Sequence, residues 1–157
     1  MRVGITGHRG LPPQVEQHVR ALLDAAVTGH DPAELVGISC IADGPDSWFA
    51  ETVLTHGGRL EVVVPATAYR NSLPAEHHPT YDRLFAAAAD VHETGLTDSD
   101  SAAHMAGSEI LVGLVDELLA VWDGQPARGY GGTADVVTYA HQTGTPVHVL
   151  WPHDATR

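Results

Sequence analysis

The sequence predicts an α/β fold: a single Rossmann-like three-layer α/β/α domain, 1–157, with a mostly parallel sheet. Short apolar, β-branched runs alternate with longer segments of helical periodicity along the 157 residues. This alternation is typical of strand–helix–strand units. The length fits one domain, and the apolar fraction of 43% is ordinary for a globular protein. No internal repeat, low-complexity segment or linker divides the sequence.

The first part of the chain supplies three expected strands. They are Arg2–Thr6, which we expect at the centre of the sheet, then Leu35–Ser39 and Leu60–Val64. The segments between them are predicted to be helices, because Pro13 and Pro45 suit the first turn of a helix and apolar residues follow at helical spacing. Glycines after the last apolar residues indicate where these helices end.

The second part continues the alternation. Further strands are expected at Asp90–Glu93, Leu118–Trp122 and Val147–Trp151. Helices are predicted at Tyr81–Ala89, at Ala102–Val115 and from near Ala134. Residues 66–80 contain prolines and lack a clear period, so we expect a long irregular connection there. Long ordered connections in compact domains tend to be functional.

The composition restricts the classes of partner. The net charge of −12 and pI near 5.1 argue against non-specific binding to nucleic acid or to an anionic membrane. Met1 leads directly into a strand and no stretch has the length of a transmembrane helix, so neither a signal peptide nor a membrane span is expected. The lone Cys40 excludes an internal disulfide and suits the cytoplasm. The eleven histidines are scattered, apart from His77-His78, so we expect no metal and no cofactor.

An anion site is predicted after the strand Leu118–Trp122. A glycine-rich turn with Arg128, Gly131, Gly132 and Thr133 follows this strand and leads into a helix. Glycines let the backbone approach an oxyanion, and the first N–H groups of a helix are unpaired and favour negative charge. Arg128 would add a charge-assisted contact to a phosphate. The alternative is a glycine-rich turn that binds nothing.

Other expected ligand-binding residues follow the remaining strands. Because the carboxyl ends of parallel strands meet at one edge of a sheet, the loops after them converge there. Asp43 could accept a hydrogen bond from a ribose hydroxyl, or could simply cap a turn. The residues expected to contact the ligand, in addition to those of the anion site, are Gly7, His8, Arg9, Ser39, Asp43, Gly44 and Asp123.

Three groups of residues also resemble a known family. They are Ile5-Thr6-Gly7-His8-Arg9, then Ser39 with Ala42-Asp43-Gly44, Asp46 and Ala50-Glu51, and finally Gly131-Gly132-Thr133 before a helix. This pattern resembles the SLOG superfamily, which contains the LOG cytokinin-activating phosphoribohydrolases and the DNA-processing protein A family. The resemblance implies a Rossmannoid fold with a nucleotide or phosphoribosyl ligand over the carboxyl ends of the strands.

The sequence departs from the LOG enzymes in two respects. Those enzymes resemble Gly-Gly-x-Gly-Thr-x-x-Glu, whereas Gly131-Gly132-Thr133 lacks the intervening residue and glycine. Those enzymes have a catalytic glutamate three residues after the threonine of their glycine motif, whereas this chain has Val136 there. Asp135 comes one residue earlier, which rotates it by about 100° around a helix of ~3.6 residues per turn. Two hypotheses remain open: a binding module or sensor for a small-molecule nucleotide, or a nucleoside 5′-monophosphate phosphoribohydrolase in which Asp135, Asp43 or Asp123 activates water. The oligomeric state stays open, with a homo-oligomer among the alternatives.

Overall fold

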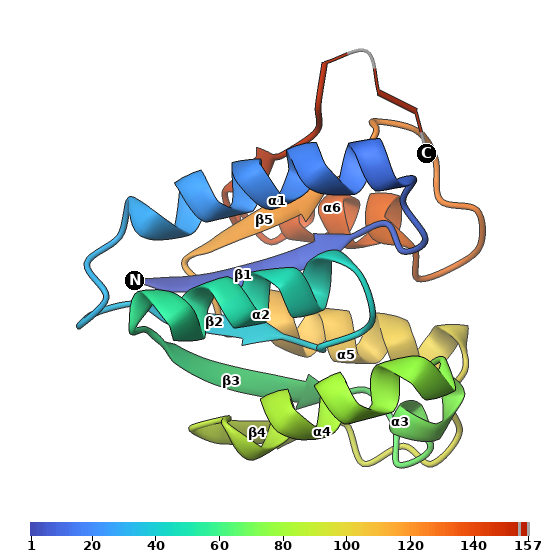
Figure 1. Ribbon diagram of the computed structural model, residues 1–157. Helices are drawn as coiled ribbons and strands as arrows, with labels where there is room; N and C mark the ends of the chain where they lie inside the picture. Colours follow the sequence, from blue (N-terminus) through green and yellow to red (C-terminus); the bar gives the residue numbers. More distant parts are fainter. Residues whose placement is uncertain (154, 157) are drawn as a thin grey trace.

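A parallel sheet forms the middle layer of the computed structural model, which describes residues 1–153 and 155–156 (Figure 1). Within these residues the sheet has six strands in the order β4-β3-β2-β1-β5-β6, and each neighbouring pair is parallel. The strands are β1 (Arg2–Gly7), β2 (Val36–Ser39), β3 (Arg59–Val64), β4 (Asp90–Glu93), β5 (Glu117–Val121) and β6 (Val147–Val149). The predicted Rossmann-like α/β class is therefore confirmed, with β1 in the interior of the sheet.

Helices cover both faces of the sheet. They are α1 (Pro13–Thr28), α2 (Pro45–His56), α3 (Tyr69–Ser72), the 3₁₀ helix η1 (Ala75–His77), α4 (His78–Ala86), α5 (Ser101–Gly113) and α6 (Thr133–Gln142). Helices α1, α2 and α4 pack side by side on one face, and α5 and α6 pack together on the other (Figure 1). No helix in the described part of the chain combines the length and apolar character needed to cross a membrane.

The connection after β3 differs from the sequence prediction. Residues 66–80 were expected to be irregular, but they contain α3, η1 and the first residues of α4. Helix α4 begins at His78 rather than Tyr81, because Pro79 fits the first turn of a helix. Strand β6 ends at Val149 rather than Trp151, shortly before Pro152, which has no N–H to donate.

The core fixes the positions of the strand ends. Four residues of α1 at helical spacing are buried against the sheet, and β5 is buried from Leu118 to Val121. Gly37 in β2 lets α2 approach closely, because an added Cβ would lie 2.8 Å from a methyl group of Val53. Each fully buried aliphatic or aromatic side chain of this kind contributes roughly 1.5–3 kcal/mol. The loops beyond the strands therefore start from well-fixed points.

The chain changes direction in the sheet at β1. Strands β2, β3 and β4 extend to one side of β1, and the chain then crosses to β5 and β6 on the other side. Loops after β1 and β5 thus diverge at the edge where the strands end, and open α/β sheets bind ligands in the crevice at such a point. We call this edge the carboxyl edge, and the opposite one, where the strands begin, the amino edge.

Candidate functional site

A cavity of about 350 Å³ opens at the carboxyl edge, between the loops that follow β1 and β5. Its walls include 7–9 after β1 and 127–133 after β5. The β2–α2 loop, α3 and α5 supply further wall residues. The volume is in the range of pockets for small molecules.

The glycine-rich turn forms one end of the cavity, and its glycines are required by the backbone itself. Gly131 has a φ of +84°, and an added Cβ would lie 2.9 Å from the carbonyl oxygen of Ser101. At Gly132, an added Cβ would lie 2.9 Å from the Cβ of Ala127. The two glycines therefore allow the turn to pack tightly against α5 and against its own preceding residues.

Helix α6 begins at this turn without a side-chain cap. The N–H groups of Asp135 and Val136 donate to the carbonyl of Gly132. The N–H groups of Thr133 and Ala134 find no acceptor among the described residues. The first turn of α6 thus presents free donors and the positive end of a helix dipole beside the cavity.

Two arginines add positive charge to the cavity walls. Arg128 is exposed, and its guanidinium has no hydrogen-bond or ion-pair partner among the described residues. Arg9 donates from Nε and Nη2 to Oδ1 of Asp43 at 3.0 and 2.6 Å, with 47% of its side chain exposed. Because Arg9 is paired with Asp43, Arg128 is the arginine of the lining whose charge no described residue balances.

Asp46, in the first turn of α2, lies in the opposite wall. Burial raises the pKa of its carboxyl to about 7, although the N–H of Ala42, at 3.4 Å, and the charge of Arg9 lower it. The negative charge of Asp43 raises it further. The carboxyl of Asp46 therefore titrates near neutral pH, as acid–base and ligand-sensing groups often do.

The β2–α2 loop holds Asp46 rigidly. Ser39 is fully buried; its hydroxyl donates to the carbonyl of Asp46 at 3.0 Å and accepts from the N–H of Ile41 at 2.9 Å. Ile41 has a φ of +47°, a left-handed conformation that is unfavourable for a β-branched residue. Ser47 adds a hydrogen bond to the carbonyl of Ala42 at 2.5 Å. Ser39 therefore contributes to the site by fixing the backbone of the β2–α2 loop that carries Asp46.

His8 and Asp123 join the ends of β1 and β5. Nε2 of His8 lies 3.1 Å from Oδ1 of Asp123, and both side chains are nearly buried. The ring of His8 also packs edge-on against Trp151, with centroids 5.8 Å apart. This pair fixes the two strand ends between which the cavity opens.

The structure gathers most of the predicted ligand-binding residues around the cavity. Those that line it are Gly7, His8, Arg9, Arg128, Gly131, Gly132 and Thr133. Those outside its lining are Ser39, Asp43, Gly44, Asp123 and Asp135.

Two of the three predicted catalytic carboxylates, Asp135 and Asp43, are engaged elsewhere. Oδ2 of Asp135 accepts from the N–H of Gly131 at 2.9 Å, so it stabilises the glycine turn. The carboxylate of Asp43 is paired with Arg9. Neither side chain is among those that line the cavity.

Sequence reasoning missed several polar residues of the cavity. Asp46 was noted only as part of the family resemblance, and Tyr69, His104 and Ser108 were not selected, although all four line the cavity. The rings of Tyr69 and His104 contact each other edge-on, with their centroids 5.7 Å apart. Burial raises the pKa of Tyr69 well above its usual range and lowers that of His104. Only Asp46 had a local signal, its place directly after the helix-starting Pro45.

Cys40 also lines the cavity, and it is a poor nucleophile there. Burial raises the pKa of its thiol well above the usual range, and the charge of Asp46 adds to this effect. The reactive form of a cysteine is the thiolate. The thiol therefore stays protonated at neutral pH.

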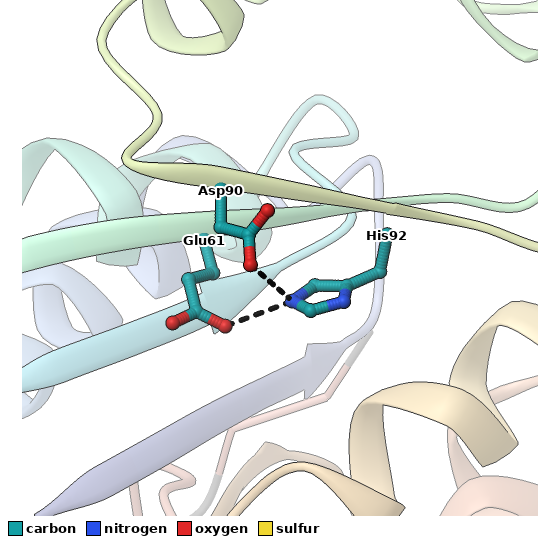
Figure 2. A group of neighbouring side chains, drawn as sticks. All are labelled: Glu61, Asp90 and His92. Carbon is teal, nitrogen blue, oxygen red and sulfur yellow. Dashed lines mark hydrogen bonds and ion pairs between the residues drawn. The ribbon is translucent and has the colours of Figure 1, made fainter.

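The amino edge carries the side chains most similar to a metal-binding group. Glu61, Asp90 and His92 have ligand atoms within 4.8 Å of one another, and Figure 2 shows their side chains converging. Nε2 of His92 lies 2.8 Å from Oε1 of Glu61 and 3.8 Å from Oδ2 of Asp90. However, Arg2 donates to both oxygens of Glu61, at 3.0 and 2.8 Å.

This arrangement is an ion-pair network. The bidentate contact from Arg2 lowers the pKa of Glu61 to about 2, and the hydrogen bond from His92 contributes to the shift. Arg2 places a fixed positive charge beside the carboxylate that a metal ion would need. We therefore assign the group to the stabilisation of β1, β3 and β4 at the amino edge.

A doubly wound parallel sheet with a cavity at its switch point defines a Rossmann-like α/β fold. No family model and no curated protein matches the sequence. Among solved structures, DNA processing protein A from Streptococcus pneumoniae is similar, with a TM-score of 0.67, 19% identity and coverage of 94% of this chain and 49% of that one. The same protein from Helicobacter pylori, which binds single-stranded DNA, has a TM-score of 0.66 and 18% identity. The match covers 95% of this chain and 64% of that one.

A third similar structure is the molybdenum cofactor binding protein from Rippkaea orientalis, with a TM-score of 0.61 and 16% identity. The match covers 94% of this chain and 74% of that one. These structures share the fold of this chain, so the Rossmannoid fold that the resemblance implied is confirmed. This chain spans about half the length of the S. pneumoniae protein. The expectation that nucleic acid is not a partner finds no support here, because the H. pylori neighbour binds single-stranded DNA.

Proposed function

We propose that this protein binds a nucleotide or a phosphoribosyl derivative in the cavity, with the phosphate at the start of α6. One observation carries the proposal: Arg128 and Thr133 line the same glycine-rich end of one cavity, and the N–H groups of Thr133 and Ala134, in the first turn of α6, have no acceptor among the described residues. Free helix N–H groups and an arginine are the donors that bind phosphate in proteins. The neighbouring structures support ligand binding by this fold and leave the ligand itself open.

The rest of the cavity suits the remainder of such a ligand. Asp46, Tyr69 and His104 add polar groups to the cavity lining, while Leu111 and Val136 supply apolar surface. A cavity of about 350 Å³ is of the size used for small ligands. We therefore assign the sugar and base to this part.

Hydrolysis of the N-glycosidic bond is the second candidate. It requires a carboxylate at the reacting bond, and the side chains of Asp135 and Asp43 are engaged outside the cavity lining. Asp46 is the carboxyl group of the lining, which keeps this candidate open. Ligand binding without chemistry is the better-supported reading.

Titration calorimetry tests the proposal. The ligands are a panel of nucleoside mono- and diphosphates, ribose 5-phosphate and a short single-stranded oligonucleotide, and released base is followed by chromatography. Arg128→Ala should weaken binding of the preferred ligand about tenfold to a hundredfold, because it removes a charge-assisted contact worth roughly 1.5–3 kcal/mol. Its stability should change by no more than about 0.5 kcal/mol.

Arg59→Ala is the matched control. Arg59 is also exposed and has no ion-pair partner among the described residues, but it begins β3 at the amino edge. This variant carries the same change of charge and should bind as the parent does. Equal loss of affinity in both variants would mean that net charge, and not the position of Arg128, causes the loss, and this would contradict the proposal. Binding by Arg128→Ala as tight as that of the parent would also contradict the proposed phosphate site.

A further inference from the structure

Two helices begin at the cavity: the first turn of α6 lines it with Thr133, and the first turn of α2 lines it with Asp46. We infer that Asp46 makes the cavity selective for ligands that carry negative charge at one end only: a phosphate at α6 and, at α2, a neutral hydrogen-bond donor such as a sugar hydroxyl or an amino group. The inference rests on the proposed function and narrows its ligand class. It excludes ligands with phosphates at both ends.

The first turn of α2 has few donors to offer a ligand. Its first residue, Pro45, has no N–H, and the N–H groups of Ser47 and Trp48 already donate to the carbonyl of Gly44. The carboxyl group of Asp46 belongs to the same turn and lies in the cavity wall. The positive end of the α2 dipole is thus met by a carboxylate of the chain itself.

The backbone of Asp46 is held in place. Its carbonyl accepts from the buried hydroxyl of Ser39, and Oδ2 of its side chain faces the N–H of Ala42 at 3.4 Å. The backbone that carries this carboxyl thus stays at the cavity wall. An incoming ligand therefore meets a fixed acceptor at this end.

The other titratable groups around Asp46 do not cancel its charge. Burial keeps the thiol of Cys40 and the phenol of Tyr69 protonated, and it lowers the pKa of His104, so that these three groups are uncharged above neutral pH. The charge of Arg9 is paired with Asp43. With its pKa near 7, Asp46 is ionised at pH 8.5 and protonated at pH 5.5.

A second phosphate would lie against this ionised carboxylate. Two like charges about 6 Å apart at an effective dielectric constant of about 20 repel strongly enough to cost on the order of a hundredfold in affinity. A hydroxyl or amino group at the same place would donate a hydrogen bond to the carboxylate instead.

The test compares two ligands that differ at one end. Calorimetry at pH 8.5 measures ribose 5-phosphate and ribose 1,5-bisphosphate against the parent, Asp46→Asn and Asp24→Asn. Asparagine keeps the shape and an acceptor oxygen but removes the charge. Asp24→Asn is the matched control, because Asp24 is an exposed acid on α1 whose removal changes the net charge equally.

The parent and Asp24→Asn should bind ribose 5-phosphate at least tenfold more tightly than the bisphosphate. In Asp46→Asn this ratio should fall below about threefold. At pH 5.5 the affinity ratio of the parent should approach that of Asp46→Asn. Because residue 46 of this variant does not titrate, any change of its ratio with pH reports the titration of the ligand phosphates.

Equal affinity of the parent for both ligands at pH 8.5, or an unchanged ratio in Asp46→Asn, would overturn the inference and leave the proposed function standing. If the parent binds neither sugar phosphate nor any nucleotide, the proposed function fails and the inference fails with it.

Discussion

The amino and carboxyl edges of the sheet differ in how their carboxylates and helix ends are partnered. At the amino edge two partly buried carboxylates are paired: Glu61 contacts Arg2 and His92, and Glu117 contacts His30 and His148. At the carboxyl edge, Arg128 and the first N–H groups of α6 have no partner among the described residues. These carboxylates of the amino edge are held in ion pairs, whereas the start of α6 at the carboxyl edge has hydrogen-bond donors with no acceptor among the described residues.

Two carboxyl groups express this difference directly. The pKa of Glu61 is lowered to about 2, chiefly by the hydrogen bonds from Arg2, while the pKa of Asp46 is raised to about 7, chiefly by burial. The same chemical group is thus stabilised as an anion at one edge and destabilised at the other. Polar groups held in unfavourable states are a recurring feature of functional sites.

Removing the charge of Asp46 should give the largest effect on stability. Because the pKa of Asp46 is higher in the folded state, folding binds protons between about pH 4 and 7, and the parent loses stability as pH rises through this window. Asp46→Asn does not titrate and should be more stable than the parent at pH 8 by about 2–4 kcal/mol. Chemical denaturation from pH 4 to 8 measures this, and parallel stability profiles for the two proteins would refute it.

Removing the charge of Glu61 should act in the opposite direction. Its folded-state pKa is lowered, so its contribution is present above about pH 4.5 and is lost as pH falls toward 2. We expect Glu61→Gln to cost about 1–3 kcal/mol at pH 7, allowing for solvent screening of the half-exposed Arg2, and to flatten the acid limb of the stability profile. Glu93→Gln, an exposed position on β4, is the control and should leave that limb unchanged. Nucleotide affinity should not change in either variant.

Adding a methyl group to the glycine turn should affect stability and binding together. Gly131→Ala introduces a Cβ 2.9 Å from the carbonyl oxygen of Ser101 in a left-handed conformation, and we expect a loss of about 1–2 kcal/mol. The displaced turn should also weaken nucleotide binding at least tenfold. Gly10→Ala is the matched comparison, because Gly10 has a φ of +67° but open space around its Cβ position. It should lose about 1 kcal/mol of stability and keep its affinity, so an equal loss of binding in both variants would contradict the role of this turn.

The smallest effect is expected from Asp135→Asn. An asparagine oxygen can still accept from the N–H of Gly131, so the turn should persist. Nucleotide affinity should stay within about threefold of the parent, or rise slightly, because a negative charge near the phosphate is removed. Calorimetry with a base-release assay measures both properties. Retained affinity with lost turnover would instead identify a hydrolase that uses this carboxylate.

The sequence was most informative where one segment holds its own signal. Alternating strands and helices predicted the parallel sheet, and the run from Arg128 to Thr133 predicted the glycine turn, because the residues involved are neighbours in the chain. The roles of Ser39 and Asp135 were harder to assign. Each side chain bonds to backbone groups of its own loop, and no spacing rule shows whether a polar residue faces a ligand or its own backbone.

The opposite wall of the cavity depends on long-range packing. Asp46, Tyr69 and His104 come from three segments that the fold brings together, and each is an ordinary residue in its local sequence. The shift in the pKa of Asp46 arises from burial by these segments. Such a property emerges only when the sheet and its helices have assembled.

A crystal structure with a bound nucleoside 5′-monophosphate tests the central claim most directly. We predict a phosphate within hydrogen-bonding distance of the N–H groups of Thr133 and Ala134, with the guanidinium of Arg128 turned toward it and the ribose directed toward Asp46. A nucleotide bound outside the cavity, or bound with its phosphate against Asp46, would contradict the claim that the unpaired groups of the carboxyl edge form the phosphate site.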